Sequence, residues 1–496
     1  ALTGAAAGSP RTDPASGRSV FTGAATPHAT SIVLDPAALG LGRDELYVGA
    51  ISVVDQLRID LAPYADGALA APGARVRDAS LSSGAMLALT YHLAGNLTLG
   101  IDARINPAEA VPSGYDALKF QTLGGGERDV WASVGGSIRL TGDLLVGAGV
   151  TYQYTLLRLR YARDTALERG SGPGGVTSDC GGAPCGLGHP LATELDDISV
   201  SASWKSTSNL RVNIGVMYQV ARDTWLAVAY HTPPGLGIQT ALSGSATITR
   251  APRDVPVDGD AVVHGDALIE LQFPASVDAE LRARLPRELE LHIGGRWEDL
   301  SRLTAYDVRT FGRALVSAGI PEWTERPSGL KDSIAAWAGV EQVPRDGALL
   351  LGARLGVESA ALPPARTSAL AVAPRSYTVD VGAQLRLARG LSLQAAYGLQ
   401  YFPTITVGAD ETAFDPAARV RCVDGGYDYA TGDCQATREG YAIASVNYRL
   451  VPAATVEHAP KLAGTTACPT AFPPQATTVP SARRATECSP PAATST

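Results

Sequence analysis

The chain has 496 residues, a net charge of −8 at pH 7 and a pI near 5.5. Charged residues make up only 18% of it, against about 25% in soluble domains. The acidic balance excludes a basic surface for nucleic acid, and because no uninterrupted apolar run reaches the length of about eighteen residues that a spanning helix needs, helical membrane spans are excluded as well.

Residues 1–44 come before any strand pattern and are rich in Ala, Gly, Ser and Thr. The segment is too long and too apolar for a simple linker, so it needs a role of its own. Its start, Ala1-Leu2-Thr3-Gly4, lacks the charged beginning and apolar core of a secretion signal. The chain is therefore either an exported protein whose signal peptide has been removed or a cytosolic one.

Residues 45–450 repeat one unit, a segment that alternates apolar with polar or small residues, which is the period of a sheet with two unlike faces. Closure of such a sheet with both ends on one side requires an even number of strands. Two segments are interrupted, at 206–208 and 273–275, where we expect kinks. We count about fourteen segments: 45–61, 78–93, 97–106, 128–140, 144–163, 193–220, 224–248, 262–285, 288–311, 331–343, 348–360, 375–387, 391–408 and 438–450.

The two faces of these strands differ in kind. One face carries full charges such as Glu290, Arg354 and Asp380, which a packed core could not bury without partners. The other face is apolar throughout and often ends in tyrosine, as at Tyr152 and Tyr377, which fits a lipid-facing band with aromatic girdles. A soluble antiparallel sheet with one solvated face is the alternative interpretation.

The connections between the segments alternate between short turns and long loops. Short turns on one rim and long loops on the other are typical of all-β transmembrane barrels, in which the long loops lie outside the cell. This pattern favours the barrel over the soluble sheet. The long connections lie at about 62–77, 107–127, 164–192, 249–261, 312–330, 361–374 and 409–438.

The six cysteines fall in three close pairs, Cys180 with Cys185, Cys422 with Cys434, and Cys468 with Cys488. Close pairs among Gly, Pro, Asp and Thr favour local disulfides made in an oxidising compartment over zinc ligands, although spacing does not prove the pairing. The last pair lies in residues 451–496, a Pro-, Ala- and Thr-rich segment that reads as a mostly disordered tail.

Motifs for cofactors and metals are weak. Residues 170–175 have the glycine spacing of a dinucleotide site, but more glycine follows where a helix would have to begin. The seven histidines show no metal-ligand spacing, and acidic residues near 424–433 lack the pattern of an EF-hand. We expect no cofactor, no metal and no enzymatic activity.

Four stretches carry a resemblance to a known family: Ser16–Ala25 leading to Asp35-Pro36-Ala37, Leu97–Ile101 leading to Asn106-Pro107, Val212–Gln219, and Leu271–Val277. In this order, over roughly residues 15 to 450, they resemble the FadL/TodX family of outer-membrane transport proteins. That family has an Asn-Pro-Ala motif at the position that reads Asp35-Pro36-Ala37 here.

The resemblance implies an antiparallel β-barrel of about fourteen strands over 45–450, with residues 1–44 folded inside it as a hatch. A third strand that kinks inward and opens the wall sideways is also implied. Alternatively, the hatch residues only fill the lumen and the loop residues form an ordinary loop core. The implied sites are the hatch contacts Phe21, Val33, Leu34, Asp35, Pro36, Ala37 and Leu39, the kinked third strand at Gly100, Ile101, Asn106 and Pro107, and the capture loop at Leu118, Phe120 and Leu123.

The implied function is passive uptake of long-chain fatty acids or aromatic hydrocarbons across a Gram-negative outer membrane. Solutes would be captured at the outer loops and released sideways into the bilayer. The partners would be that solute, outer-membrane lipid and lipopolysaccharide, with no nucleic acid and a monomeric chain. A barrel enzyme or adhesin, or a porin for polar solutes, are the alternatives.

Overall fold

The computed structural model describes residues 20–61, 75–114, 122–164, 177–180, 183–185, 197–206, 209–237, 240–249, 261–317, 322–342, 348–364, 367, 373–388, 390–407, 420–428, 433–438, 441–444 and 454–458. In these residues, no helix is both long and apolar enough to cross a membrane.

Strands dominate, as the two-residue period predicts, and every predicted strand segment contains at least one of them. In chain order they are β1 Glu45–Leu61, β2 Arg75–Ala94, β3 Leu97–Ile105, β4 Glu109–Val111, β5 Gly124–Arg139, β6 Leu144–Asp164, β7 Thr177–Cys180, β8 Ala183–Cys185, β9 Asp197–Ser206, β10 Asn209–Ala221, β11 Thr224–His231, β12 Thr240–Thr249, β13 Val262–Leu271, β14 Ser276–Leu285, β15 Leu289–Glu298, β16 Ala305–Phe311, β17 Trp323–Pro327, β18 Ser333–Gln342, β19 Leu349–Glu358, β20 Ser376–Ala388, β21 Leu391–Tyr401, β22 Ile405–Val407, β23 Val420–Asp428, β24 Asp433–Arg438, β25 Tyr441–Ala444 and β26 Ala454–His458. The helical segments are short: η2 Ala29–Val33, η3 Pro36–Leu41, η5 Pro234–Gly237, η7 Pro286–Glu288, η8 Leu300–Arg302 and α4 Arg313–Ser317.

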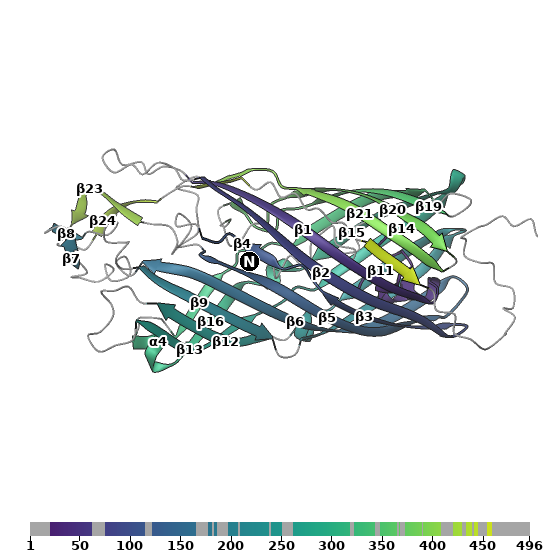
Figure 1. Ribbon diagram of the computed structural model, residues 1–496, viewed down its shortest axis with the longest axis horizontal. Coiled ribbons are helices and arrows are strands. Elements are labelled where there is room, and N and C mark those ends of the chain that lie inside the picture. The colour runs from purple at the N-terminus through teal and green to yellow at the C-terminus, as the bar shows by residue number, and fades with distance from the viewer. Residues whose placement is uncertain are drawn as a thin grey trace, which may run out of the picture.

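The sheet closes on itself through antiparallel pairs. From β1 the ladder passes through β2, β3, β5 and β6, which lie side by side as long tilted ribbons in Figure 1. It passes from β18 through β19 and β20 to β21, and β1 receives β25 and β26 on its other edge. Because β26 also pairs with β21, and β25 with β22, the ring returns to its start. The predicted transmembrane β-barrel is confirmed.

Between β6 and β18 the wall runs at two levels. One level is the ladder β6–β10–β11–β14–β15–β18, and the other is β6–β9–β12–β13–β16–β17. The breaks between the levels adjoin one another, since His231 at the end of β11 pairs with Ser276, which pairs with Glu298 at the end of β15. The interruption predicted at 273–275 falls on this line, between β13 and β14, whereas residues 207 and 208 of the other predicted interruption lie outside the described residues.

The wall is apolar outside and polar inside. Leu355, Ile334 and Val134 are 62%, 61% and 60% exposed, whereas the charged side chains of Arg354 and Asp102 are 2% and 3% exposed. Along β18 the burial alternates without interruption, as the sequence predicts for a two-faced strand. A soluble sheet would show the opposite arrangement, so this inversion fits a wall between lipid and a polar lumen.

The two ends of the barrel differ. The small hairpins β7–β8 and β23–β24, and α4, lie toward one end, and each falls in a predicted long loop (Figure 1). The same end holds a cluster of buried apolar side chains, the distal apolar cluster. Its members are Leu157, Leu159, Ala202, Leu242, Ala246, Ile248, Val263, Ala267, Ile269, Leu271, Phe273, Leu300, Leu303, Leu315, Leu330, Ala361, Leu362 and Ala373.

The last strand reaches beyond its predicted end. Residues 454–458 form β26 and pair with β1 and β21, although the sequence assigned everything after Leu450 to a tail. The proline and alanine residues around this segment conceal the strand pattern in the sequence. The other residues of the predicted tail lie outside the described part of the chain.

Candidate functional site

The hatch is a compact segment, residues 20–41, almost every residue of which is buried. Two short helical turns shape it, and each begins at a side chain that caps its free backbone N–H groups. His28 Nδ1 accepts from Thr30 N at 3.2 Å, and Asp35 Oδ1 accepts from Ala37 N at 2.8 Å. Pro36 follows directly at the first helical position, where its missing N–H costs nothing. Asp35-Pro36-Ala37 is thus a local start signal for η3.

Glycines on the inward face of the wall leave room for the hatch. Any side chain at Gly215 of β10 would overlap the Asp35 carboxylate, and one at Gly147 of β6 would overlap the backbone of Pro36 and Ala37. The Leu39 side chain lies over Gly100 of β3 in the same way. The hatch therefore approaches the wall backbone directly at these positions, which side chains of ordinary size would prevent.

Hydrogen bonds fasten the far end of the hatch near the short turn between β5 and β6. Ser137 Oγ donates to Ala37 O at 2.9 Å, and Arg139 Nη2 donates to Gly40 O at 3.1 Å. These bonds satisfy carbonyl groups that a two-turn segment cannot pair internally. The hatch is therefore fixed at the short-turn end of the barrel, opposite the distal apolar cluster.

The beginning of the hatch is held on the opposite wall. Phe21 adopts a left-handed φ of 65°, which is unusual for a bulky residue, and its ring packs over Gly352 and Gly382. Its N–H donates to Glu341 Oε1 at 3.2 Å, and Arg354 Nη1 donates to Thr22 O at 2.6 Å. Buried charges of the wall thus bind the backbone of the hatch directly.

The predicted hatch residues divide into two groups. Phe21, Asp35, Pro36, Ala37 and Leu39 touch the wall, as described above. Val33 and Leu34 pack with Ile32 and Leu39 in a cluster inside the hatch. The first group thus lies at the contact between hatch and wall, and the second group packs within the hatch; their role in gating stays a prediction.

The third strand is interrupted at its end. β3 alternates regularly through buried Gly100 and exposed Ile101, and its ladder with β2 stops at the pair Ala85 and Ile105. Beyond the Asn106-Pro107 break, β4 pairs with β5. Among the described residues, no ladder joins β4 to the remaining stretch of β2, residues 75–84. The β2 ladder therefore ends before 106–107, and Gly100 lies under the hatch, while the inward kink of the third strand stays a prediction.

Pro107 marks the interruption of this ladder. A side chain at Gly84 of β2 would lie 2.9 Å from the Pro107 ring, so the two residues are in close contact. Asn106 is buried, and its backbone N–H donates to Asp129 O at 2.9 Å. Proline has no N–H to give to a ladder, which accounts for the end of the pairing at this point.

A band of polar side chains separates the hatch from the distal apolar cluster. His231 bonds to Asn213 Oδ1 at 2.8 Å and to Asp278 Oδ2 at 3.0 Å, and Arg296 Nε donates to Asp278 Oδ1 at 2.6 Å. Arg211 of β10 donates to Ser276 Oγ at 3.1 Å, while its Nε makes no hydrogen bond within the described residues. The two-residue period puts Arg296 on the same face as Glu290, but the sequence could not indicate this network.

A second polar group lies on β3 and β5. Arg104 Nε and Nη2 donate to Asp102 Oδ1 and Oδ2, each at 2.8 Å, and the guanidinium lies 5.6 Å from the centre of the Trp131 ring. Two parallel hydrogen bonds and an aromatic face stabilise this buried pair, and together they offset part of the free-energy cost of removing its charges from water.

Other predicted residues lie wholly or partly outside the described part of the chain. Leu118 and Phe120 of the capture loop are among these, while Leu123 is half-buried and its N–H donates to Arg160 O at 2.7 Å. The backbones of Cys180, Cys185, Cys422 and Cys434 are described but their side chains are not, and Cys468 and Cys488 lie outside. The capture loop and the disulfides stay predictions.

No protein-family model matches the chain, and no curated protein matches it by sequence. Solved structures match it closely in fold. A Pseudomonas aeruginosa FadL homologue is 14% identical with a TM-score of 0.66 over 90% of this chain and 98% of that one.

Two further structures show the same likeness. The Pseudomonas putida toluene transporter TodX is 13% identical with a TM-score of 0.56, over 87% of this chain and 94% of its own. The Ralstonia pickettii toluene transporter TbuX is 14% identical with a TM-score of 0.52, over 87% and 93%. The resemblance seen in the sequence is therefore confirmed in three dimensions: the chain has the FadL-type fold, a β-barrel with a hatch in its lumen.

Proposed function

We propose that the protein is an outer-membrane channel of Gram-negative bacteria that admits hydrophobic small molecules passively and is closed by its hatch. The observation that carries this proposal is the hatch docked on inward-facing glycines inside a wall that is apolar outside. A segment held this closely blocks water and ions, while its release needs no covalent step. Flow down a gradient requires no cofactor.

The path we infer runs from the long-loop end to the membrane. A solute would first meet the distal apolar cluster, because apolar surface there gives it a favourable alternative to water. It would then pass the polar band and the hatch. The interruption between β2 and β4 at Asn106 and Pro107 is the proposed exit into the bilayer.

The polar band bears on the substrate class. Arg211 lies beside this path with an Nε–H that makes no hydrogen bond in the described residues, and a guanidinium group pairs well with a carboxylate. This supports a long-chain fatty acid as the substrate. The two similar structures named above, TodX and TbuX, are toluene transporters, so aromatic hydrocarbons are the second candidate.

The test is uptake by cells that lack their own channel for hydrophobic solutes. The full chain is expected to restore uptake of a labelled long-chain fatty acid, and Arg211→Met is expected to lower that uptake while leaving toluene uptake unchanged. The matched control is Arg222→Met in the exposed turn between β10 and β11. Equal loss for both solutes would contradict the fatty-acid assignment, and no uptake of either would contradict the channel.

A variant without residues 1–44 separates a hatch-closed channel from an open porin or an adhesin. Removal of these residues should raise ion conductance in planar bilayers, because the hatch otherwise fills the lumen. High conductance of the intact chain would instead favour the porin for polar solutes.

A further inference from the structure

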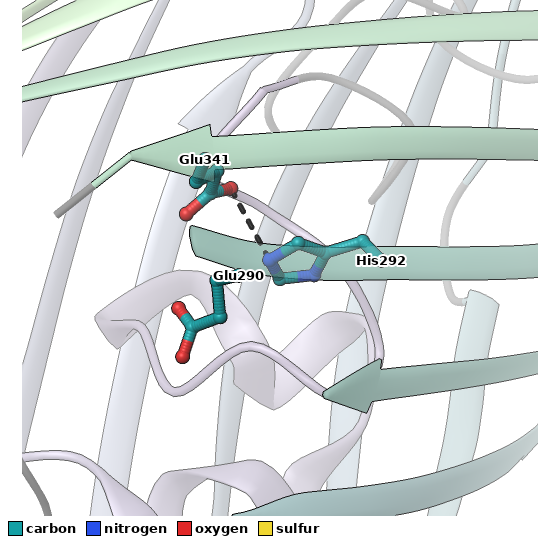
Figure 2. Close-up of side chains that lie close together, drawn as sticks. All are labelled: Glu290, His292 and Glu341. Carbon is teal, nitrogen blue, oxygen red and sulfur yellow. Dashed lines mark ion pairs between the residues drawn. The ribbon is translucent and has the colours of Figure 1, made fainter. Parts of the chain in front are cut away.

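His292 is the centre of a buried polar group on the inward face of β15 (Figure 2). Its side chain is fully buried, with Nδ1 3.3 Å from Glu280 Oε1 of β14 and Nε2 3.5 Å from Glu341 Oε1 of β18. Glu290, two residues earlier on β15, points to the same side (Figure 2). One ligand atom from each of Glu290, His292 and Glu341 lies within 4.8 Å of the other two.

The register makes this arrangement costly without a cation. Glu290 and Glu341 are direct cross-strand partners, and both point inward. Like charges directly opposite each other on neighbouring strands destabilise a sheet. Arg282 offsets part of the repulsion by donating to Glu290 Oε1 at 2.6 Å, which leaves the second oxygen of Glu290 to a further partner.

The spacing and orientation of His292 suit a metal ligand. Nitrogen and oxygen ligands lie about 2.0–2.2 Å from zinc in tetrahedral sites, so two of them are separated by roughly 3.3–3.6 Å, and His292 Nε2 lies 3.5 Å from Glu341 Oε1. This Nε2 is buried and makes no hydrogen bond within the described residues. The other ring nitrogen faces the Glu280 carboxylate, which is how metal-binding histidines are usually oriented.

We propose that Glu290, His292 and Glu341 bind a divalent transition-metal ion such as Zn²⁺, with Glu280 orienting the imidazole. The rival interpretation is a protonated His292 that bridges Glu280 and Glu341 without any metal. Metal binding has a consequence for the hatch, because Glu341 Oε1 also accepts the Phe21 N–H and Glu280 Oε1 lies 3.5 Å from Thr26 Oγ1. The proposed ion therefore lies beside the groups that hold the start of the hatch.

The test uses the full chain, purified in detergent, stripped of metal with a chelator and titrated with Zn²⁺ against a coloured competitor. One equivalent is expected to bind, and Co²⁺ in its place should give the visible absorption of a low-symmetry site with nitrogen and oxygen ligands. His292→Ala and Glu341→Gln are each expected to lower the affinity about tenfold or more. Glu341→Gln keeps the shape of the side chain, so it tests binding even where His292→Ala folds poorly.

Two other histidines serve as controls. His231→Ala removes a histidine that is equally buried and ion-paired but lies outside the cluster, and His92→Ala removes a half-buried one beside Asp44. Both variants should keep the tight site. No tight binding by the unaltered chain, or binding that His92→Ala removes and Glu341→Gln leaves intact, would overturn the proposal in favour of the protonated bridge.

Discussion

Glycines of the wall decide how closely the hatch can approach it. Gly147 and Gly215 face the η3 turn from neighbouring strands, β6 and β10, and pair directly with each other across the ladder. Together they form a flat surface against which Asp35, Pro36 and Ala37 pack. The fit therefore depends on the absence of two side chains as much as on the hatch sequence.

Gly147→Val should undock the hatch while the barrel stays closed. The added side chain would collide with the backbone at Pro36 and Ala37, and overpacking of this kind costs about 1–3 kcal/mol. That energy raises the undocked population by roughly 5- to 150-fold. Ion conductance in planar bilayers measures this undocked population. Ala148→Val, on the exposed face of the same strand, is the control. Equal conductance of the two variants would contradict docking of the hatch on Gly147.

Asp35 should make hatch docking depend on pH. Burial raises the pKa of Asp35 well above its ordinary value, and the nearby negative charges of Asp278 and Glu280 raise it further. The docked hatch therefore favours the protonated carboxyl. This contribution is complete below the ordinary aspartate pKa of about 3.9 and is lost as the pH rises through the raised value.

The fraction of closed channels should accordingly fall as the pH rises from about 4, as measured by conductance. Asp35→Asn keeps an oxygen that can accept the Ala37 N–H but removes the titration, so its conductance should vary less with pH. An unchanged pH profile in Asp35→Asn would assign the dependence to other carboxyl groups.

The two edges of β2 are paired over different stretches. Its β1 edge is paired from Arg75 to Thr90, whereas its β3 edge is paired only from Ala85 onward. The stretch 75–84 therefore borders the proposed exit. Ser82 of this stretch is buried, while its neighbour Leu81 is 72% exposed to the outside.

A bulky thiol reagent on Ser82→Cys should block uptake of the hydrophobic solute, because it would occupy the inward side of the proposed exit. The same reagent on Leu81→Cys should leave most of the uptake, since that side chain points outward. Labelled-solute uptake after modification checks both. Full activity of modified Ser82→Cys would argue for another exit.

The strands show which features of the fold a local sequence pattern can predict. Alternation predicted the segments and their faces, including outward Tyr152 and inward Arg354, because a two-residue period fixes which side chains share a face. It also predicted the break at 273–275. It did not predict that this break adjoins the ends of β11 and β15, since the register between strands decides that. It missed β26, where the period is short and flanked by proline.

The molecule as a whole reverses the usual distribution of polarity. In the described part of the chain, large apolar side chains such as Leu355 and Ile334 are exposed on the outside, whereas charged side chains such as Arg354 and Asp102 are buried inside. An outer face of this kind is unfavourable in water and suits lipid.

Leu355→Arg tests this reversal. An arginine on the lipid face near the middle of a membrane costs about 2–4 kcal/mol, so unfolding by denaturant in phospholipid vesicles should show a loss of that order. Gln384→Arg introduces the same side chain on the inward face of the adjacent β20 and should cost less. Equal losses would mean that the two faces do not meet different solvents.

The buried contacts of the candidate site are where the sequence was least informative. The residues Glu290, Arg354 and Asp380 were assigned correctly to one face, but their partners come from distant parts of the chain, as with Phe21 and Glu341, which are 320 residues apart. Period and composition describe neighbours along a strand, and they carry no information about such pairs. The caps of η2 and η3 are local and could have been found.

The contact between Phe21 and Glu341 also constrains the order of assembly. The hatch precedes every described strand in the chain, yet its binding surface is complete only when β18 has formed, because Phe21 and Glu341 are 320 residues apart, and β1 pairs with β26, which comes later still. Contacts this distant make folding slow. The hatch and β1 must therefore be kept from aggregating until their distant partners have been made, so truncation before β26 should harm insertion more than its few residues suggest.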